Sequence, residues 1–420
     1  MFCGIILISF FTMSFMPLFS KIGVCGLFAT ALLYQKLGVK ETVCVSNKHV
    51  YLVLIGVFII HLVAGINTEA VHSKAFWSDI ALQLPFLLMP LSFALLPTWP
   101  SSYLRRLYLL FFCLVVLSAA ASTVHYLQHT VEINKLYSQS QIMPTVPDYI
   151  RFSLMVTFAT VIGTLYSSSN GRAYGIRLSM KASTGFLVLY LYLLAVRSGL
   201  GAFTILGILS VGWLIIKKRR YRQGALLGIL LVVMPSISFL YFPTFRNKYY
   251  NTEYDVAHVK TTSSANNLSL VGRYYSYQVG VRLVQKNPWF GVGKADMKKE
   301  IGHFYQQDYP DIDPSSYLMP HNQFLYCCVA FGGIGLLIFS YSFYYPLFRM
   351  RQQASFLFIA HYIIVSLSFI AEFTLDQESQ IGILYTLIFI LLSLASFIQA
   401  GQADPILNWG PYISHKQATD

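Results

Sequence analysis

His321 stands at the start of an apolar run, in Pro320-His321-Asn322, where an unpaired imidazole is costly. Histidine is the side chain whose unperturbed pKa suits proton transfer near neutrality, so His321 is a candidate base. A hydrogen-bonded imidazole at a capped helix start is the structural alternative. Arg197 interrupts an earlier apolar run, and Arg273 lies in the polar stretch before His321. These positions predict chemistry at a membrane surface, within reach of a lipid-linked substrate.

The apolar run around Arg197, residues 184–216, is too long to cross a membrane once. As one helix it would measure about 50 Å, against a hydrocarbon core of about 30 Å. Arg197-Ser198-Gly199-Leu200-Gly201 is the expected turning point, because it combines two glycines with a charge. A snorkelling arginine is the alternative. A reversal that holds the guanidinium beside the outer polar lobe favours a functional role.

The polar stretch, residues 241–318, predicts one long segment outside the membrane. Within it, residues 269–285 predict a helix that a Ser or Asn caps and Asn287-Pro288 ends. Arg273 and Tyr277 fall on one face of this helix. The following Trp289-Phe290-Gly291-Val292-Gly293 predicts an aromatic anchor at the lipid interface and then a tight turn.

Two acid or histidine pairs could suggest a metal, and both are weak. Asp311 and Asp313 resemble the carboxylate pair of metal-dependent glycosyltransferases, but a solvated turn before Pro314 is the better interpretation. His125 and His129 share a helical face without a third ligand. We therefore expect neither a metal nor another cofactor.

Composition predicts an all-α polytopic membrane protein. Hydrophobic residues make up 55% of the 420 residues and charged residues 11%, where an ordinary soluble domain carries about 25% charged residues. The first apolar segment lacks a basic start and a cleavage site, so we take it as a retained span. About twelve apolar segments begin near Phe2, Ile22, His49, Ser78, Arg106, Ile150, Thr184, Gly199, Gly224, Asn322, Ser355 and Gln380.

The distribution of Lys and Arg predicts the orientation. They concentrate in alternate connections, most densely at residues 217–222, which places both termini in the cytoplasm and residues 241–318 outside. This run is an orientation signal beside anionic lipid, so the net charge of +13 does not indicate nucleic-acid binding. The expected parts are 1–183 and 184–241 (membrane helices), 242–319 (outer loop domain between spans 9 and 10), 320–400 (membrane helices) and 401–420 (cytoplasmic tail).

Taken together, the motifs resemble the O-antigen ligase/polymerase superfamily, most closely its O-antigen ligases. The resemblance covers about residues 184–337. The matching pieces are Arg197-Ser198-Gly199, Arg273-Tyr274, Asn287-Pro288-Trp289-Phe290-Gly291-Val292-Gly293, Pro320-His321-Asn322 and Gly332-Gly333-Ile334-Gly335.

The resemblance implies a GT-C-like glycosyltransferase of the bacterial inner membrane with a periplasmic active site. It would move a glycan from undecaprenyl diphosphate to a sugar hydroxyl of lipid A–core, inverting the anomeric carbon without a metal. Carried onto this chain, Arg197 and Arg273 would hold the diphosphate and His321 would activate the acceptor. Asn322, Tyr274 and Tyr277 would support them.

Other functions stay open at this point. A polymerase of the same superfamily or a transferase of glycan to protein would share these motifs, although a single long outer loop favours the ligase. A polysaccharide or lipid transporter would instead carry ionisable residues deep in several spans. Here Asp79, His125, Arg151, Arg197 and His321 fall near span ends, which favours an enzyme at the surface.

Overall fold

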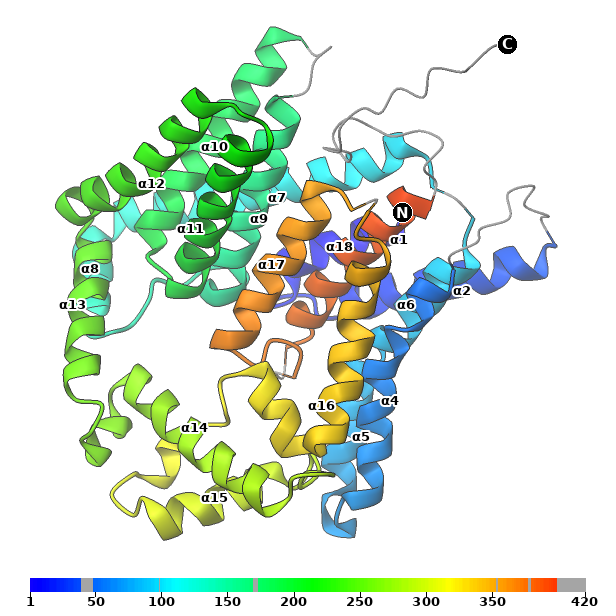
Figure 1. Cartoon of the computed structure of the whole chain (residues 1–420), viewed down its shortest axis with the longest axis vertical. Helices are drawn as coiled ribbons and strands as arrows, with labels where there is room; N and C mark the ends of the chain where they lie inside the picture. The colour runs from blue at the N-terminus through cyan, green and yellow to red at the C-terminus, as the bar shows by residue number, and fades with distance from the viewer. Residues whose placement is uncertain (39–47, 98, 169–172, 353, 377–378, 399–420) are drawn as a thin grey trace.

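The computed structural model describes residues 1–38, 48–97, 99–168, 173–352, 354–376 and 379–398. These residues fold into helices and turns, with no strand among them, so the all-helical prediction is confirmed. Figure 1 shows long helices packed into one body and a lobe of shorter helices along its lower edge. The expected tail, 401–420, lies outside the described residues.

Each of the twelve predicted apolar segments coincides with a helix or with consecutive helices. In chain order they are α1 (Phe2–Thr12), α2 (Leu18–Lys36), α3 (His49–Leu52) with α4 (Ile55–Val63) and η1 (Ala64–Asn67), η2 (Ala70–His72) with α5 (Ser73–Gln83) and α6 (Pro85–Leu95), α7 (Ser101–Gln128), α9 (Tyr149–Ser167), α10 (Tyr174–Leu194), α11 (Arg197–Gly212) with η3 (Trp213–Lys217), α12 (Tyr221–Tyr241), α16 (Gln323–Arg349), α17 (Phe356–Ala371) and α18 (Ile381–Ile398).

Helix length separates these segments into groups. Eight of the described helical segments are long and apolar enough to cross a membrane, and α1, α17 and α18 are shorter apolar helices. The twelfth segment, α10, carries Arg177 and Lys181 in its first half. The helices therefore define a multi-pass membrane protein, and a count of twelve crossings stays a prediction.

The reversal expected at residues 197–201 lies slightly earlier in the chain. Helix α10 ends at Leu194, Ala195 adopts a left-handed conformation (φ 50°), and α11 already begins at Arg197. The first glycine of the motif has a packing role instead, because a side chain at Gly199 would overlap Ser153 of α9. The correction moves the turn by two residues and leaves Arg197 at the helix start.

The lower lobe is built from α13 (Pro243–Ala257), η4 (Thr262–Asn266), α14 (Ser269–Lys286), α15 (Met297–Asp308) and η5 (Pro314–Ser316), and α8 (Thr130–Ser138) packs against α13. The predicted helix at 269–285 is confirmed as α14. Its start has no cap from its own N-cap side chain, contrary to expectation. Asp255 of α13 accepts a hydrogen bond from the backbone N–H of Leu270 instead, at 3.3 Å.

Helix α16 is a hairpin rather than one straight span. Gly332 adopts φ 69° and ψ −172°, which breaks the helix between Gln323 and Arg349. The rings of Phe324 and Phe339 lie 6.3 Å apart, whereas a continuous helix would separate these positions by about 22 Å. His321 therefore precedes a short half-helix that folds back at Gly332, and not the mouth of a full span as the sequence suggested.

Two of the sequence motifs meet at this reversal. The backbone N–H groups of Val292 and Gly293 donate to the carbonyls of Val329 and Ala330 at 2.9 and 3.0 Å, and Gly333 N–H donates to Pro288 at 2.7 Å. A side chain at Gly332 would overlap the backbone at Trp289. The contact explains why both motifs are rich in glycine: only a bare backbone permits this approach.

Candidate active site

A buried carboxylate joins the two parts of the candidate site. Glu372, which follows α17, accepts a hydrogen bond from Arg273 Nη2 at 2.5 Å through Oε1. Its Oε2 lies 2.8 Å from Nδ1 of His321. The Glu372 side chain is only 3% exposed, against 26% for Arg273 and 20% for His321. The carboxylate thus ties a guanidinium of the lobe to an imidazole of the membrane body.

Two of the predicted supporting residues hold the backbone around His321. Tyr277 donates its hydroxyl hydrogen to the His321 carbonyl at 2.7 Å. Asn322 caps the half-helix by accepting from Leu325 N–H at 3.0 Å, and its amide donates to the Ile370 carbonyl at 3.3 Å. Both residues therefore fix the position of the imidazole from the backbone side.

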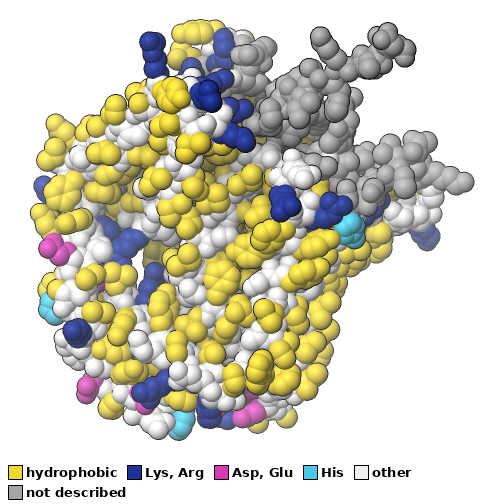
Figure 2. Space-filling view, in the orientation of Figure 1, with side chains coloured by type: hydrophobic (Ala, Val, Ile, Leu, Met, Phe, Trp, Pro, Cys, Tyr) yellow, Lys and Arg dark blue, Asp and Glu magenta, His cyan; other side chains and the backbone are white. Residues whose placement is uncertain are grey.

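A cavity of about 740 Å³ opens beside this carboxylate. Arg197 and Arg273 both line it, although they are far apart in sequence, and so do Tyr274 and Tyr277. Figure 2 shows basic side chains inside a recess between the lobe and the apolar helices above it. The remaining lining is mostly apolar and comes from α9, α11, α14 and α17 (Ile150, Ala202, Ile205, Leu270, Leu367 and Ile370).

Arg197 lines this cavity and has one buried donor without a hydrogen-bond partner. Its Nε donates to Thr252 Oγ1 at 3.0 Å. Its Nη2 lies 3.6 Å from Asp255 Oδ2, which is too far for a hydrogen bond, and no other partner for Nη2 occurs among the described residues. Because Nη2 is itself buried, a ligand in the cavity would meet the rest of the Arg197 side chain, which is 31% exposed.

Lys248 adds a third cation to the lining, and the sequence analysis did not single it out. Burial, and then the positive charge of Arg197, lower the pKa of Lys248 to about 8. The shift means that the protonated form of Lys248 is less favourable in this cavity than in water. A bound anion would stabilise the charged form.

The structure thus brings together four of the predicted residues and places one beside them. Arg197, Arg273, Tyr274 and Tyr277 share the cavity. His321 does not line it directly and reaches it through Glu372, which does.

Sequence reasoning missed Glu372, although a signal was present. It is the first acid after Asp313 and directly follows the apolar helix α17. A charge at that position calls for a partner.

Neither the acid pair Asp311/Asp313 nor the histidine pair His125/His129 belongs to a group of three possible metal ligands among the described residues. The backbone groups of Asp311 and Asp313 bond to the side chain of Asn266, and both aspartates are exposed, as expected for a turn. The rings of His125 and His129 lie 4.6 Å apart without a third ligand.

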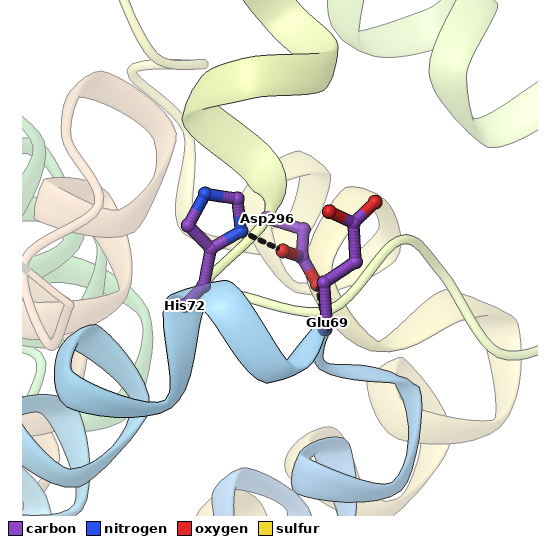
Figure 3. A group of neighbouring side chains, drawn as sticks. All are labelled: Glu69, His72 and Asp296. Atoms are coloured by element: carbon purple, nitrogen blue, oxygen red, sulfur yellow. Dashed lines mark hydrogen bonds and ion pairs between the residues drawn. The ribbon is translucent and has the colours of Figure 1, made fainter.

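One other group of possible ligands, Glu69, His72 and Asp296, lies at the edge of the lobe. Figure 3 shows Asp296 between the other two, hydrogen-bonded to the His72 ring, while the Glu69 carboxylate turns away from that ring. Glu69 is paired with Lys299 at 2.8 Å, and its backbone N–H donates to Asp296 at 3.0 Å. Each of these side chains therefore has a partner, and the contacts tie the segment before α5 to the lobe.

Fold and site together define a multi-pass helical membrane protein with a cationic cavity between its membrane body and a polar lobe. Residues 182–340 match the family model described as O-antigen ligase. This segment runs from α10 through the lobe into α16, and it contains Arg197, Arg273 and His321. No curated protein matches the chain. This match supports the resemblance to the O-antigen ligase/polymerase superfamily that the motifs indicated.

Proposed function

We propose that the protein is an O-antigen ligase-like glycosyltransferase of the GT-C type. It takes a glycan from undecaprenyl diphosphate and joins it to a sugar hydroxyl of lipid A–core. The observation that supports this most directly is the bridge from Arg273 through Glu372 to His321, beside a cavity that Arg197 also lines. The carboxylate of Glu372 therefore bridges Arg273, the cation for the leaving group, and His321, the base for the acceptor.

The chemistry follows from these groups. The acceptor hydroxyl attacks the anomeric carbon as the bond from that carbon to the diphosphate oxygen breaks, which inverts the configuration. His321 takes the hydroxyl proton on Nε2, because Nδ1 faces Glu372 and the carboxylate stabilises the resulting imidazolium. The guanidiniums of Arg197 and Arg273 stabilise the negative charge on the departing undecaprenyl diphosphate, so the mechanism requires no metal.

We also propose that both termini face the cytoplasm and that the lobe faces the periplasm. In Figure 2 a group of Lys and Arg side chains lies at the upper edge, opposite the lobe, and a broad apolar band separates the two. This distribution supports the orientation that the positive-inside rule predicts for an inner-membrane protein. The domain boundaries expected from the sequence belong to the same proposal.

A polymerase of the same superfamily would use the same catalytic groups, so these groups do not distinguish it from a ligase. The single outer lobe between α12 and α16 favours the ligase, since acceptor choice depends on loop shape and polymerases often carry two comparable loops. A transporter is less well supported. The buried groups His61, Asp79 and Asp376 pair with one another. Two further buried groups, Arg151 and His361, have the local partners Asp148 and the Thr386 carbonyl.

Deletion of the gene, followed by electrophoresis of lipopolysaccharide, tests the proposal. Loss of a ligase leaves lipid A–core without polymer and strands the undecaprenyl-linked glycan. Loss of a polymerase leaves core that bears one repeat unit, and this result would contradict the ligase assignment. Unchanged lipopolysaccharide would contradict both.

Lys248 makes donor binding depend on pH. The side chain is charged below about pH 8 and neutral above it, so the KM for the lipid-linked donor should rise between pH 7 and pH 9. A diphosphate esterified at both ends changes no charge in this range. Lys248→Arg stays charged and should give a donor KM that is flat with pH. The same pH dependence in Lys248→Arg would show that another group is responsible.

A further inference from the structure

A buried cluster of charged side chains lies close to the proposed site. Lys294 donates to Asp376 Oδ1 at 2.8 Å and also contacts Asp79. His61 bridges the same two acids, with Nδ1 2.9 Å from Asp79 and Nε2 3.3 Å from Asp376. The exposed fractions of these four side chains lie between 2% and 13%. The cluster joins α4, α5, the turn before α15 and the segment after α17.

Lys294 lies between two carboxylates in this cluster. Burial alone would lower the pKa of Lys294, but the carboxylates of Asp376 and Asp79 outweigh it and raise the pKa, so Lys294 is a cation. Buried ion pairs contribute little net stability compared with apolar side chains of the same size. The cluster is therefore more informative about the positions that it fixes than about the stability of the fold.

What the cluster fixes is the segment from Glu372 to Asp376. At its far end, Asp376 Oδ2 accepts from Gln323 Nε2 at 2.5 Å, and Leu375 N–H donates to Gln323 Oε1 at 2.9 Å. At its near end, Glu372 holds His321. Only three residues lie between the two ends, so a shift of Asp376 moves the carboxylate that orients the imidazole.

Lys294 reaches this segment because of the glycine turn that precedes it. Gly291 and Gly293 have φ values of 70° and 82°, a region that side chains disfavour. The turn is hydrogen-bonded to Val329 and Ala330 in the short half-helix of α16. The motif that the sequence analysis interpreted as an interfacial turn therefore also delivers a cation into the membrane body.

We propose that Lys294 is a positioning residue for glycosyl transfer: through Asp376 it holds Glu372, and hence His321, in the orientation that accepts the proton. This inference rests on the proposed function. Lys294 itself touches no reacting atom. Its loss should therefore slow the chemical step and leave donor binding by Arg197 and Arg273 nearly unchanged.

The test uses the full-length protein and measures kcat and the donor KM separately. Lys294→Met should lower kcat by about 100-fold, as expected for a misplaced catalytic group, with little change in donor KM. In a Glu372→Gln background the same substitution should cost little more, because both changes disturb one unit. Lys286→Met is the matched control, since Lys286 is a lysine of the same lobe that is 57% exposed.

A second variant guards against misfolding. Lys294→Met alone leaves a buried acid without its cation, whereas Lys294→Met combined with Asp376→Asn removes one charge of each sign. We expect this double variant to elute as a folded protein and still show the low kcat. A near-normal kcat in the double variant would overturn the inference. So would an effect of Lys294→Met that is confined to donor KM, or losses of kcat that multiply fully when Lys294→Met is combined with Glu372→Gln. Absence of transfer by the wild-type protein would instead overturn the proposed function.

Discussion

His321→Ala is expected to abolish glycan transfer while the protein still inserts and folds. A positioned base contributes about 10²- to 10⁴-fold to a rate, and the ring of His321 pairs with Glu372 at 2.8 Å. Glu372→Gln should cause a smaller loss, because the amide keeps the shape of the carboxylate but stabilises the imidazolium less. The measurement is transfer from a lipid-linked donor to lipid A–core by purified variants in detergent.

The matched control for this prediction is His303→Ala. His303 is an exposed histidine of α15 in the same lobe. The His303→Ala variant should therefore transfer glycan at the wild-type rate. Elution of each variant as a single folded species excludes misfolding. Wild-type activity in His321→Ala would remove the histidine from the mechanism, whatever the effect of Glu372→Gln.

Arg273→Lys and Arg197→Lys should each reduce kcat substantially. An ammonium keeps the charge but cannot hold two phosphate oxygens in the planar geometry of a guanidinium. Removing one group that stabilises developing charge costs about 10²- to 10³-fold in kcat. Arg273→Lys should be the more harmful of the two, because Arg273 also pairs with Glu372. Rates of single-turnover transfer compare the variants directly.

Arg282→Lys provides the control on the same helix. Arg282 is 53% exposed and pairs with Asp308 at 2.7 Å, so its replacement by Lys should leave the rate unchanged. An excess of chelator should also leave wild-type transfer unchanged, because guanidiniums take the place of a metal in this mechanism. Loss of activity that a divalent ion restores would contradict that mechanism. Near-normal rates in both arginine variants would exclude them as ligands of the diphosphate.

Helix α14 illustrates what local sequence predicts well. Its length, its end near Asn287-Pro288 and the shared face of Arg273 and Tyr277 follow from helical spacing, and all are present in the structure. The start of the helix differs, because the group that caps it, Asp255, belongs to another helix. Local patterns carry no information about such a partner.

The two chain reversals mark the limit of those patterns. The glycines after Arg197 suggested a turn, yet the left-handed residue is Ala195, and Gly199 instead allows α11 to approach α9. Gly332 lies in a run that reads as a single span, and it reverses the chain because the backbone at Trp289 packs against it. In both cases a long-range contact decides how a glycine is used.

The sequence alone determined that this is a helical membrane protein and that Arg197, Arg273 and His321 are its candidate groups, because apolar content and the cost of charge beside lipid are properties of short stretches. Only the tertiary structure decided which groups meet. Glu372 joins Arg273 to His321, and Lys294 reaches Asp376, through contacts between residues more than 50 positions apart. Such pairings depend on how helices pack, and a buried charge finds its partner only when the fold brings the two together.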